Sequence, residues 1–194
     1  MADYRNSGIL NTDGSGTVNA GLANNNPGDI KADGTSWQGM TGDDGTFDTF
    51  SDTTWGIRAM AVDLTTKINK DGLNTITAII TKYAPPSENN TQAYINAVTA
   101  DTDYGATEPL TADPATLAEL IRAIINHEIG DSLSAQYVSD ADIQQGITMA
   151  SGGVATTLQA AVIAVANNTD NAALILGGAL LITAALIYKY RGRK

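Results

Sequence analysis

The chain has 194 residues, 43% of them hydrophobic, which suffices for one domain with a real core and additional segments. It contains no cysteine and a single histidine, His127, which excludes disulfides, thiolate metal sites and multi-histidine metal sites. The net charge is −10, and without the four basic residues of the last six positions, seven basic residues oppose 21 acidic ones. Residues 1–188 therefore carry a net charge of −14, which makes them a poor binder of nucleic acid.

Residues 1–23 are rich in glycine, asparagine, threonine, serine and aspartate, with few apolar clusters. This composition predicts a flexible N-terminal arm that becomes ordered only against a partner. The first residues lack a basic and then apolar run, so we expect no cleavable secretory signal.

A small β-structure is predicted between residues 24 and 50. Asparagine, proline and glycine crowd residues 24–30, and residues 41–45 end in Asp-Gly, so we expect a turn in each stretch, the second inside a hairpin. Residues 46–50 alternate between polar and apolar, as a strand does. The aspartates of this region lack the regular alternation and closing glutamate of a calcium loop, so we interpret them as a solvated acidic turn. They are Asp43, Asp44, Asp48 and Asp52.

Apolar residues at helical spacing predict several helices between residues 54 and 150. One begins near Thr54, a second is capped by Asn74 and stopped by Pro85-Pro86, a third begins at Asn90 or Thr91, and a short one is capped by Ser139. Their inward residues are Ile57, Met60, Ala61, Leu64, Ile68, Ile76, Ile79, Ile80, Tyr83, Tyr94, Ile95, Val98, Ile143 and Ile147. Residues 24–150 are thus expected to form one α+β domain that is mainly α.

The most strongly patterned helix runs from Asp113, a good N-cap followed by proline, to Gly130, which can end a helix. Its apolar stripe consists of Leu117, Leu120, Ile121, Ile124 and Ile125. Glu128 continues this stripe at the last turn, where burial would raise the pKa of its carboxyl group and suit it to general acid catalysis. The alternative is an acid at the rim of the core that reaches solvent or caps a neighbouring helix.

The C-terminal part has a different composition. We interpret residues 151–170 as a linker that contains an apolar, alanine-rich helix. Residues 172–188 carry no charge, and a basic tail follows them. The length of this uncharged segment is near the lower limit for crossing a hydrocarbon core of about 30 Å. We therefore expect residues 171–194 to form a transmembrane anchor, with a buried core helix as the alternative.

Six motifs follow one another along the chain: Asn25-Asn26-Pro27-Gly28-Asp29-Ile30-Lys31, Trp37-Gln38-Gly39, Phe47 and Phe50, Gly56-Ile57-Arg58-Ala59, Ala84-Pro85-Pro86-Ser87-Glu88-Asn89-Asn90-Thr91 and His127-Glu128-Ile129-Gly130. In this order they resemble the motifs of phage virion-associated lysozyme-like proteins, which degrade peptidoglycan. Two departures are Asp29, where asparagine is usual, and Ile129, where asparagine is common. Autolysin-type glucosaminidases carry similar pieces in another order, so the resemblance implies a circularly permuted lysozyme-like domain.

The resemblance implies a peptidoglycan-degrading glycosidase of the lytic transglycosylase or the muramidase or glucosaminidase type, with Glu128 as its catalytic acid. Candidate substrate-binding residues are Asn25, Asn26, Trp37, Tyr83, Asp43 and Asp48. The two asparagines are equally suited to fixing their turn, and the two aromatic residues to core packing. A second carboxylate for hydrolysis would come from Asp43, Asp44 or Asp48, whereas a transglycosylase needs only one acid. No metal or cofactor is expected.

In this interpretation the protein is a virion component that acts in penetration of the host cell wall or in lysis. Its partners would be peptidoglycan glycan strands, a lipid bilayer through residues 171–190 and other virion proteins through residues 1–23. It would be membrane-associated in the virion and located in the host cell membrane during assembly. The competing interpretation is a non-catalytic, membrane-anchored structural virion protein that uses a lysozyme-like fold for attachment or vertex assembly.

Overall fold

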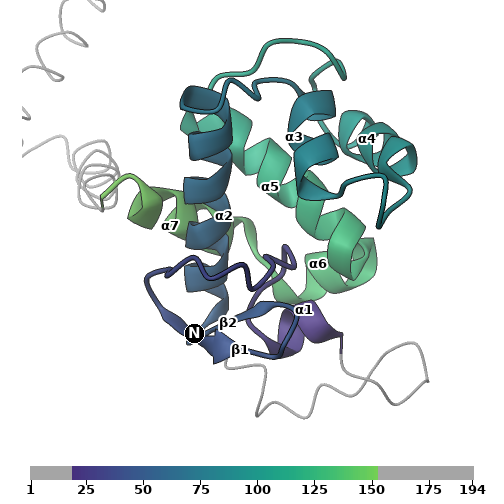
Figure 1. Cartoon of the computed structure of the whole chain (residues 1–194). Helices are drawn as coiled ribbons and strands as arrows, with labels where there is room; N and C mark the ends of the chain where they lie inside the picture. The colour runs from purple at the N-terminus through teal and green to yellow at the C-terminus, as the bar shows by residue number, and fades with distance from the viewer. Residues whose placement is uncertain (1–18, 153–194) are drawn as a thin grey trace, which may run out of the picture. The chain divides into compact units, whose positions relative to one another are not determined.

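A computed structural model describes residues 19–152, all of which belong to the first of the chain's two units, Met1–Val154. The expectations for residues 1–18, for the linker helix and for the transmembrane anchor lie outside the described residues. Seven helices and two short strands make up the described part (Figure 1), so the expected class, α+β and mainly α, is confirmed. Between residues 19 and 152, no helix combines the length and the apolar character that a membrane crossing requires.

The core lies between two long helices, α2 (Thr53–Asn69) and α5 (Pro114–Ile129). Asp52 caps α2 by accepting hydrogen bonds from two backbone amides of its first turn, and Asp113 does the same for α5. All five residues of the apolar stripe predicted for α5 are buried. Gly130 ends α5 with a φ of 85°, a conformation that glycine adopts without strain.

Three further helices follow the predicted pattern: α3 (Ile76–Tyr83), α4 (Thr91–Ala100) and α7 (Asp140–Ala150). Ser139 and Asp142 form a reciprocal capping box at the start of α7, which packs along α2. The cap of α3 is Thr75 rather than Asn74, because the Thr75 hydroxyl reaches the Ala78 amide at 3.1 Å.

Two helices were not predicted: α1 (Ala20–Ala23) and α6 (Asp131–Tyr137). Residues 20–23, assigned from the sequence to a flexible arm, form α1, and Leu22 is 2% exposed. Figure 1 shows α1 and the hairpin together at the lower end of the domain.

The sheet is an antiparallel hairpin of β1 (Met40–Asp43) and β2 (Asp48–Phe50). Its tip lies later than the sequence suggested, because residues 40–43 form a strand and the turn comes after them. There the Asp44 side chain accepts hydrogen bonds from the amides of Thr46 and Phe47 at 2.9 and 2.8 Å. An isolated bridge pairs Lys31 with Phe47, which attaches the turn at residues 24–30 to the hairpin.

Candidate functional site

The turn at residues 24–30 is held in place by two asparagines that are both 0% exposed. The Asn26 amide donates to the carbonyls of Ile30 and Asp48, both at 2.9 Å, and its oxygen accepts from the Ile30 amide at 3.0 Å. The Asn25 amide donates to the Phe50 carbonyl at 3.0 Å. Of the two roles that the sequence left open, the structure shows both asparagines in the one that fixes the turn.

This turn lies close to the last turn of α5, although about a hundred residues separate them in the chain. Gly21 of α1 lies between the two: a Cβ atom there would come within 2.9 Å of Asp29 Oδ1 and 3.0 Å of Ile129 Cγ2. The Tyr83 hydroxyl of α3 donates to the Gly28 carbonyl. The proximity of the asparagine turn to the end of the Glu128 helix is thus confirmed.

Glu128 is half-buried, and Tyr94 of α4 donates its hydroxyl to Glu128 Oε1 at 2.7 Å. Burial raises the pKa of the Glu128 carboxyl above its ordinary value, while the Tyr94 hydrogen bond and the positive charge of Lys31 act in the opposite direction. The position of Glu128 on the apolar stripe predicted this upward shift of its pKa.

A second carboxyl group, Asp29, lies within electrostatic reach of Glu128. Burial, first of all, together with the negative charges of Glu128 and Asp44, raises the pKa of Asp29 to about 7. Its backbone has a φ of 48°, in the left-handed region that aspartate and asparagine tolerate better than most residues. Sequence reasoning missed Asp29 as a site residue, although its one signal was visible, an aspartate where the resembling motif has asparagine.

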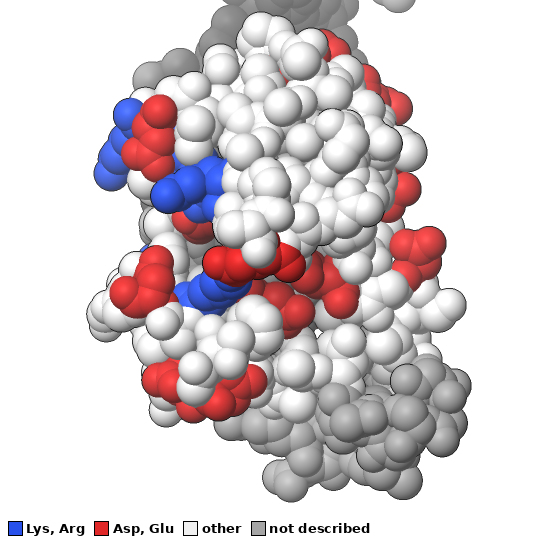
Figure 2. Space-filling model, turned by 45° about the vertical axis from the view of Figure 1, so that its right-hand side comes forward, with Lys and Arg blue, Asp and Glu red and all other residues white. Residues whose placement is uncertain are grey.

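Aromatic and charged side chains surround the two carboxyl groups. The His127 ring stacks on Tyr94 with ring centroids 3.7 Å apart, and Lys31 forms an ion pair with Glu88. Burial, first of all, and the nearby negative charge of Glu128 raise the pKa of the Tyr83 hydroxyl, so Tyr83 stays neutral. Figure 2 shows the surface hollowed between the upper and lower parts of the domain, with Asp and Glu side chains gathered in the hollow beside a Lys or Arg.

The other predicted substrate-binding residues form their own group around Asp48 in the hairpin. Asp48 is 0% exposed, and neither of its carboxylate oxygens has a hydrogen-bond partner among the described residues. Burial, first of all, and the negative charge of Asp33 raise the pKa of Asp48, and the half-buried Trp37 lies near its carboxyl group. Asp43 is exposed and accepts a hydrogen bond from the Gly45 amide at 2.9 Å. The structure brings Tyr83 and Glu128 together around Asp29, and Trp37 and Asp43 together around Asp48.

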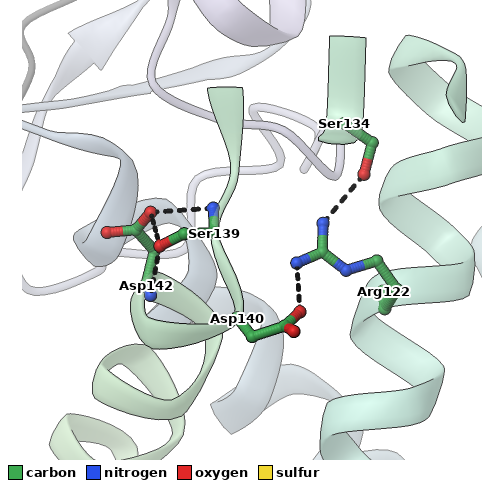
Figure 3. Close-up of polar contacts among 5 residues, drawn as sticks. All are labelled: Arg122, Ser134, Ser139, Asp140 and Asp142. Atoms are coloured by element: carbon green, nitrogen blue, oxygen red, sulfur yellow. Dashed lines mark hydrogen bonds and ion pairs between the residues drawn. The ribbon is translucent and has the colours of Figure 1, made fainter. Parts of the chain in front are cut away.

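A separate hollow of about 520 Å³ lies where α5, α6 and α7 meet. Figure 3 shows the Arg122 guanidinium donating to Ser134 at 2.9 Å and to Asp140 at 2.7 Å, so its charge is already paired. Arg122 therefore links three helices here. Within residues 19–152, no group of three or more histidines and acidic residues is arranged to hold a metal ion.

The fold and the site define a mainly helical α+β domain with two partly buried carboxyl groups, Glu128 at the end of α5 and Asp29 in the turn at residues 24–30, within electrostatic reach of each other. The sequence is 38% identical over 117 residues to Protein P5 of Pseudoalteromonas phage PM2, and the match covers 58% of this chain and 72% of that protein. The chain belongs to the family of this phage protein. No protein-family model matches the sequence.

Proposed function

We propose that the chain is a virion protein of a phage, in which residues 19–152 form a lysozyme-like domain that cleaves the glycan strands of peptidoglycan. Kinship with a phage protein supports the first part. The observation that carries the second part is the carboxyl pair Asp29 and Glu128, partly buried and within reach of each other at the end of α5.

Cleavage of a glycosidic bond requires a proton donor that stays protonated near neutral pH. Burial raises the pKa of both Asp29 and Glu128, so the pair can retain a proton where an exposed carboxylate would not. Tyr94 holds Glu128 in place through a hydrogen bond, as a reacting group requires. Acidic side chains gather in the hollow seen in Figure 2, where a glycan strand would have to bind.

The remaining parts of the proposal rest on the sequence. Residues 171–194 would anchor the protein in a lipid bilayer, and the part of the N-terminal arm before α1, residues 1–18, would contact other virion proteins. The protein would then act on the host cell wall during penetration or lysis.

One set of contacts favours the second candidate, a non-catalytic virion protein that uses the domain for attachment or assembly. Asn25, Asn26 and Tyr83, three of the residues expected to bind substrate, make internal hydrogen bonds that hold the turn. A domain kept only as a binding platform would retain such contacts without needing the acid–base pair.

The two candidates are separated by the activity of the full-length chain, purified in mild detergent, on purified peptidoglycan. We expect cleavage by the wild type and a loss on the order of 10²–10⁴-fold in Glu128→Gln, which keeps the shape of the side chain and removes its acid–base function. Asp71→Asn is the matched control, because Asp71 is an exposed carboxylate at the end of α2. A folded wild type that is inert between pH 4 and 8 would leave the non-catalytic candidate standing.

A further inference from the structure

The two carboxyl groups of the pair have unequal surroundings. Glu128 accepts a hydrogen bond from the Tyr94 hydroxyl and lies within reach of the positive charge of Lys31. Asp29 Oδ1 is buried and has no hydrogen-bond partner among the described residues. A hydrogen-bond donor and a cation both stabilise a charged carboxylate, so negative charge is better accommodated on Glu128 than on Asp29.

The groups that face Asp29 from neighbouring elements strengthen this difference. Glu128 of α5 and Asp44 of the hairpin turn bring negative charge toward it. Tyr83 of α3 and Tyr94 of α4 are neutral, because burial, first of all, and the negative charge of Glu128 raise the pKa of their hydroxyl groups. Lys31 is ion-paired with Glu88 and acts on Glu128, and Lys67 of α2, which lies over the Tyr83 ring, is ion-paired with Asp63.

We propose that Asp29 and Glu128 act as one acid–base pair in which Asp29 holds the proton and Glu128 is the charged member, so that the site hydrolyses glycosidic bonds with water. This inference rests on the proposed function and assigns the role of acid to Asp29 instead of Glu128. It also favours hydrolysis over transglycosylation, because the pair supplies the second carboxyl group that only hydrolysis needs.

The two carboxyl groups, the substrate and one water account for every bond and proton of the reaction. The Asp29 carboxyl gives its proton to the glycosidic oxygen as the bond between that oxygen and the anomeric carbon breaks. A water oxygen forms the new bond to the anomeric carbon, and the Glu128 carboxylate accepts the proton that this water loses. One water is consumed, two sugar hydroxyl groups appear, and transfer of the proton from Glu128 back to Asp29 restores the starting state.

Asp29→Asn is a clean variant for testing this assignment. Asparagine has nearly the same shape, tolerates the positive φ of this position and cannot donate an acidic proton. Asp71→Asn again serves as the control for loss of one negative charge from an exposed position.

The first measurement is a ¹³C NMR titration of the side-chain carboxyl groups in the full-length chain. We expect Asp29 to ionise after Glu128, with a midpoint near its pKa of about 7. Glu128→Gln should lower the Asp29 midpoint because it removes the neighbouring charge, and Asp71→Asn should leave it unchanged. A Glu128 that ionises after Asp29 would overturn the assignment.

The second measurement is product analysis on purified peptidoglycan. We expect reducing ends from the wild type and a loss on the order of 10²–10⁴-fold in Asp29→Asn. Products with 1,6-anhydro ends, or an Asp29→Asn chain with full activity, would refute the pair while leaving the proposed glycosidase intact. A wild type that cleaves nothing would refute the proposed function and the catalytic use of the pair together.

Discussion

Asp29→Asn should change the stability of the domain in a way that depends on pH. The folded state holds the Asp29 proton up to a pKa of about 7, whereas in an unfolded chain this carboxyl ionises near 3.8. Between these values the folded state binds more protons than the unfolded state, so this group's contribution to stability falls as the pH rises from about 3.8 to about 7. Asparagine resembles the protonated acid at every pH and escapes this loss.

The difference between 3.8 and about 7 corresponds to at most about 4 kcal/mol, at about 1.36 kcal/mol for each pH unit. Because Asp29 is partly exposed, solvent screening should reduce the effect to about 2–3 kcal/mol. We therefore expect Asp29→Asn and wild type to be about equally stable at pH 4, and the variant to be more stable by this amount at pH 8.

Urea unfolding followed by tryptophan fluorescence at pH 4, 6 and 8 measures this difference. The chain has two tryptophans, Trp37 and Trp55, and both lie in the described domain, so the signal reports on that domain. Asp71→Asn should show no comparable dependence on pH. An Asp29→Asn variant that is less stable than wild type at pH 8, or equally displaced at all three pH values, would refute the reasoning.

Three further predictions test other parts of the structure. Tyr94→Phe removes the hydrogen bond to Glu128, so it should raise the pKa of Glu128 in the carboxyl titration and cost about 1.5–3 kcal/mol of stability above that pKa. An unchanged midpoint of the Glu128 titration would contradict the contact. Asn26→Ala removes three buried hydrogen bonds and should cost at least about 2 kcal/mol in urea unfolding, whereas Asn96→Ala, at an exposed position, should cost little. Equal effects of the two substitutions would speak against the turn-fixing role. Deletion of residues 171–194 should abolish flotation with liposomes, and a truncated chain that still floats would rule out this segment as the anchor.

The sequence was most informative where a helix carries both a cap and an apolar stripe. The start and end of α5 are set by Asp113 and Gly130, and both are local signals. Helix α6 escaped prediction because it has neither signal: no side chain caps it and Ser134 is its one buried residue. The shifted hairpin tip has a different cause, since a register irregularity between Met40 and Gly42 lets glycine and aspartate, which favour turns, lie within a strand.

The candidate site could be predicted only in part for a similar reason. The position of Glu128 follows from helical periodicity, which is local. The position of Asp29 depends on a turn that Asn26 fastens to β2 and that lies close to α5, and neither feature has a signature in the residues around Asp29. The same long-range packing commits both asparagines of the turn to internal hydrogen bonds.

A buried carboxyl oxygen without a hydrogen-bond partner, such as Asp29 Oδ1, destabilises a fold when it is charged, so the presence of Asp29 calls for a reason other than stability. Asparagine would fit the same backbone without the electrostatic cost. If Asp29 served only to hold the turn, its replacement would move stability and activity in the same direction. The pair predicts opposite directions at pH 8, with Asp29→Asn more stable and less active, as expected of a group retained for function at the expense of stability. Measuring both quantities on the same preparation therefore distinguishes a reacting group from a structural one.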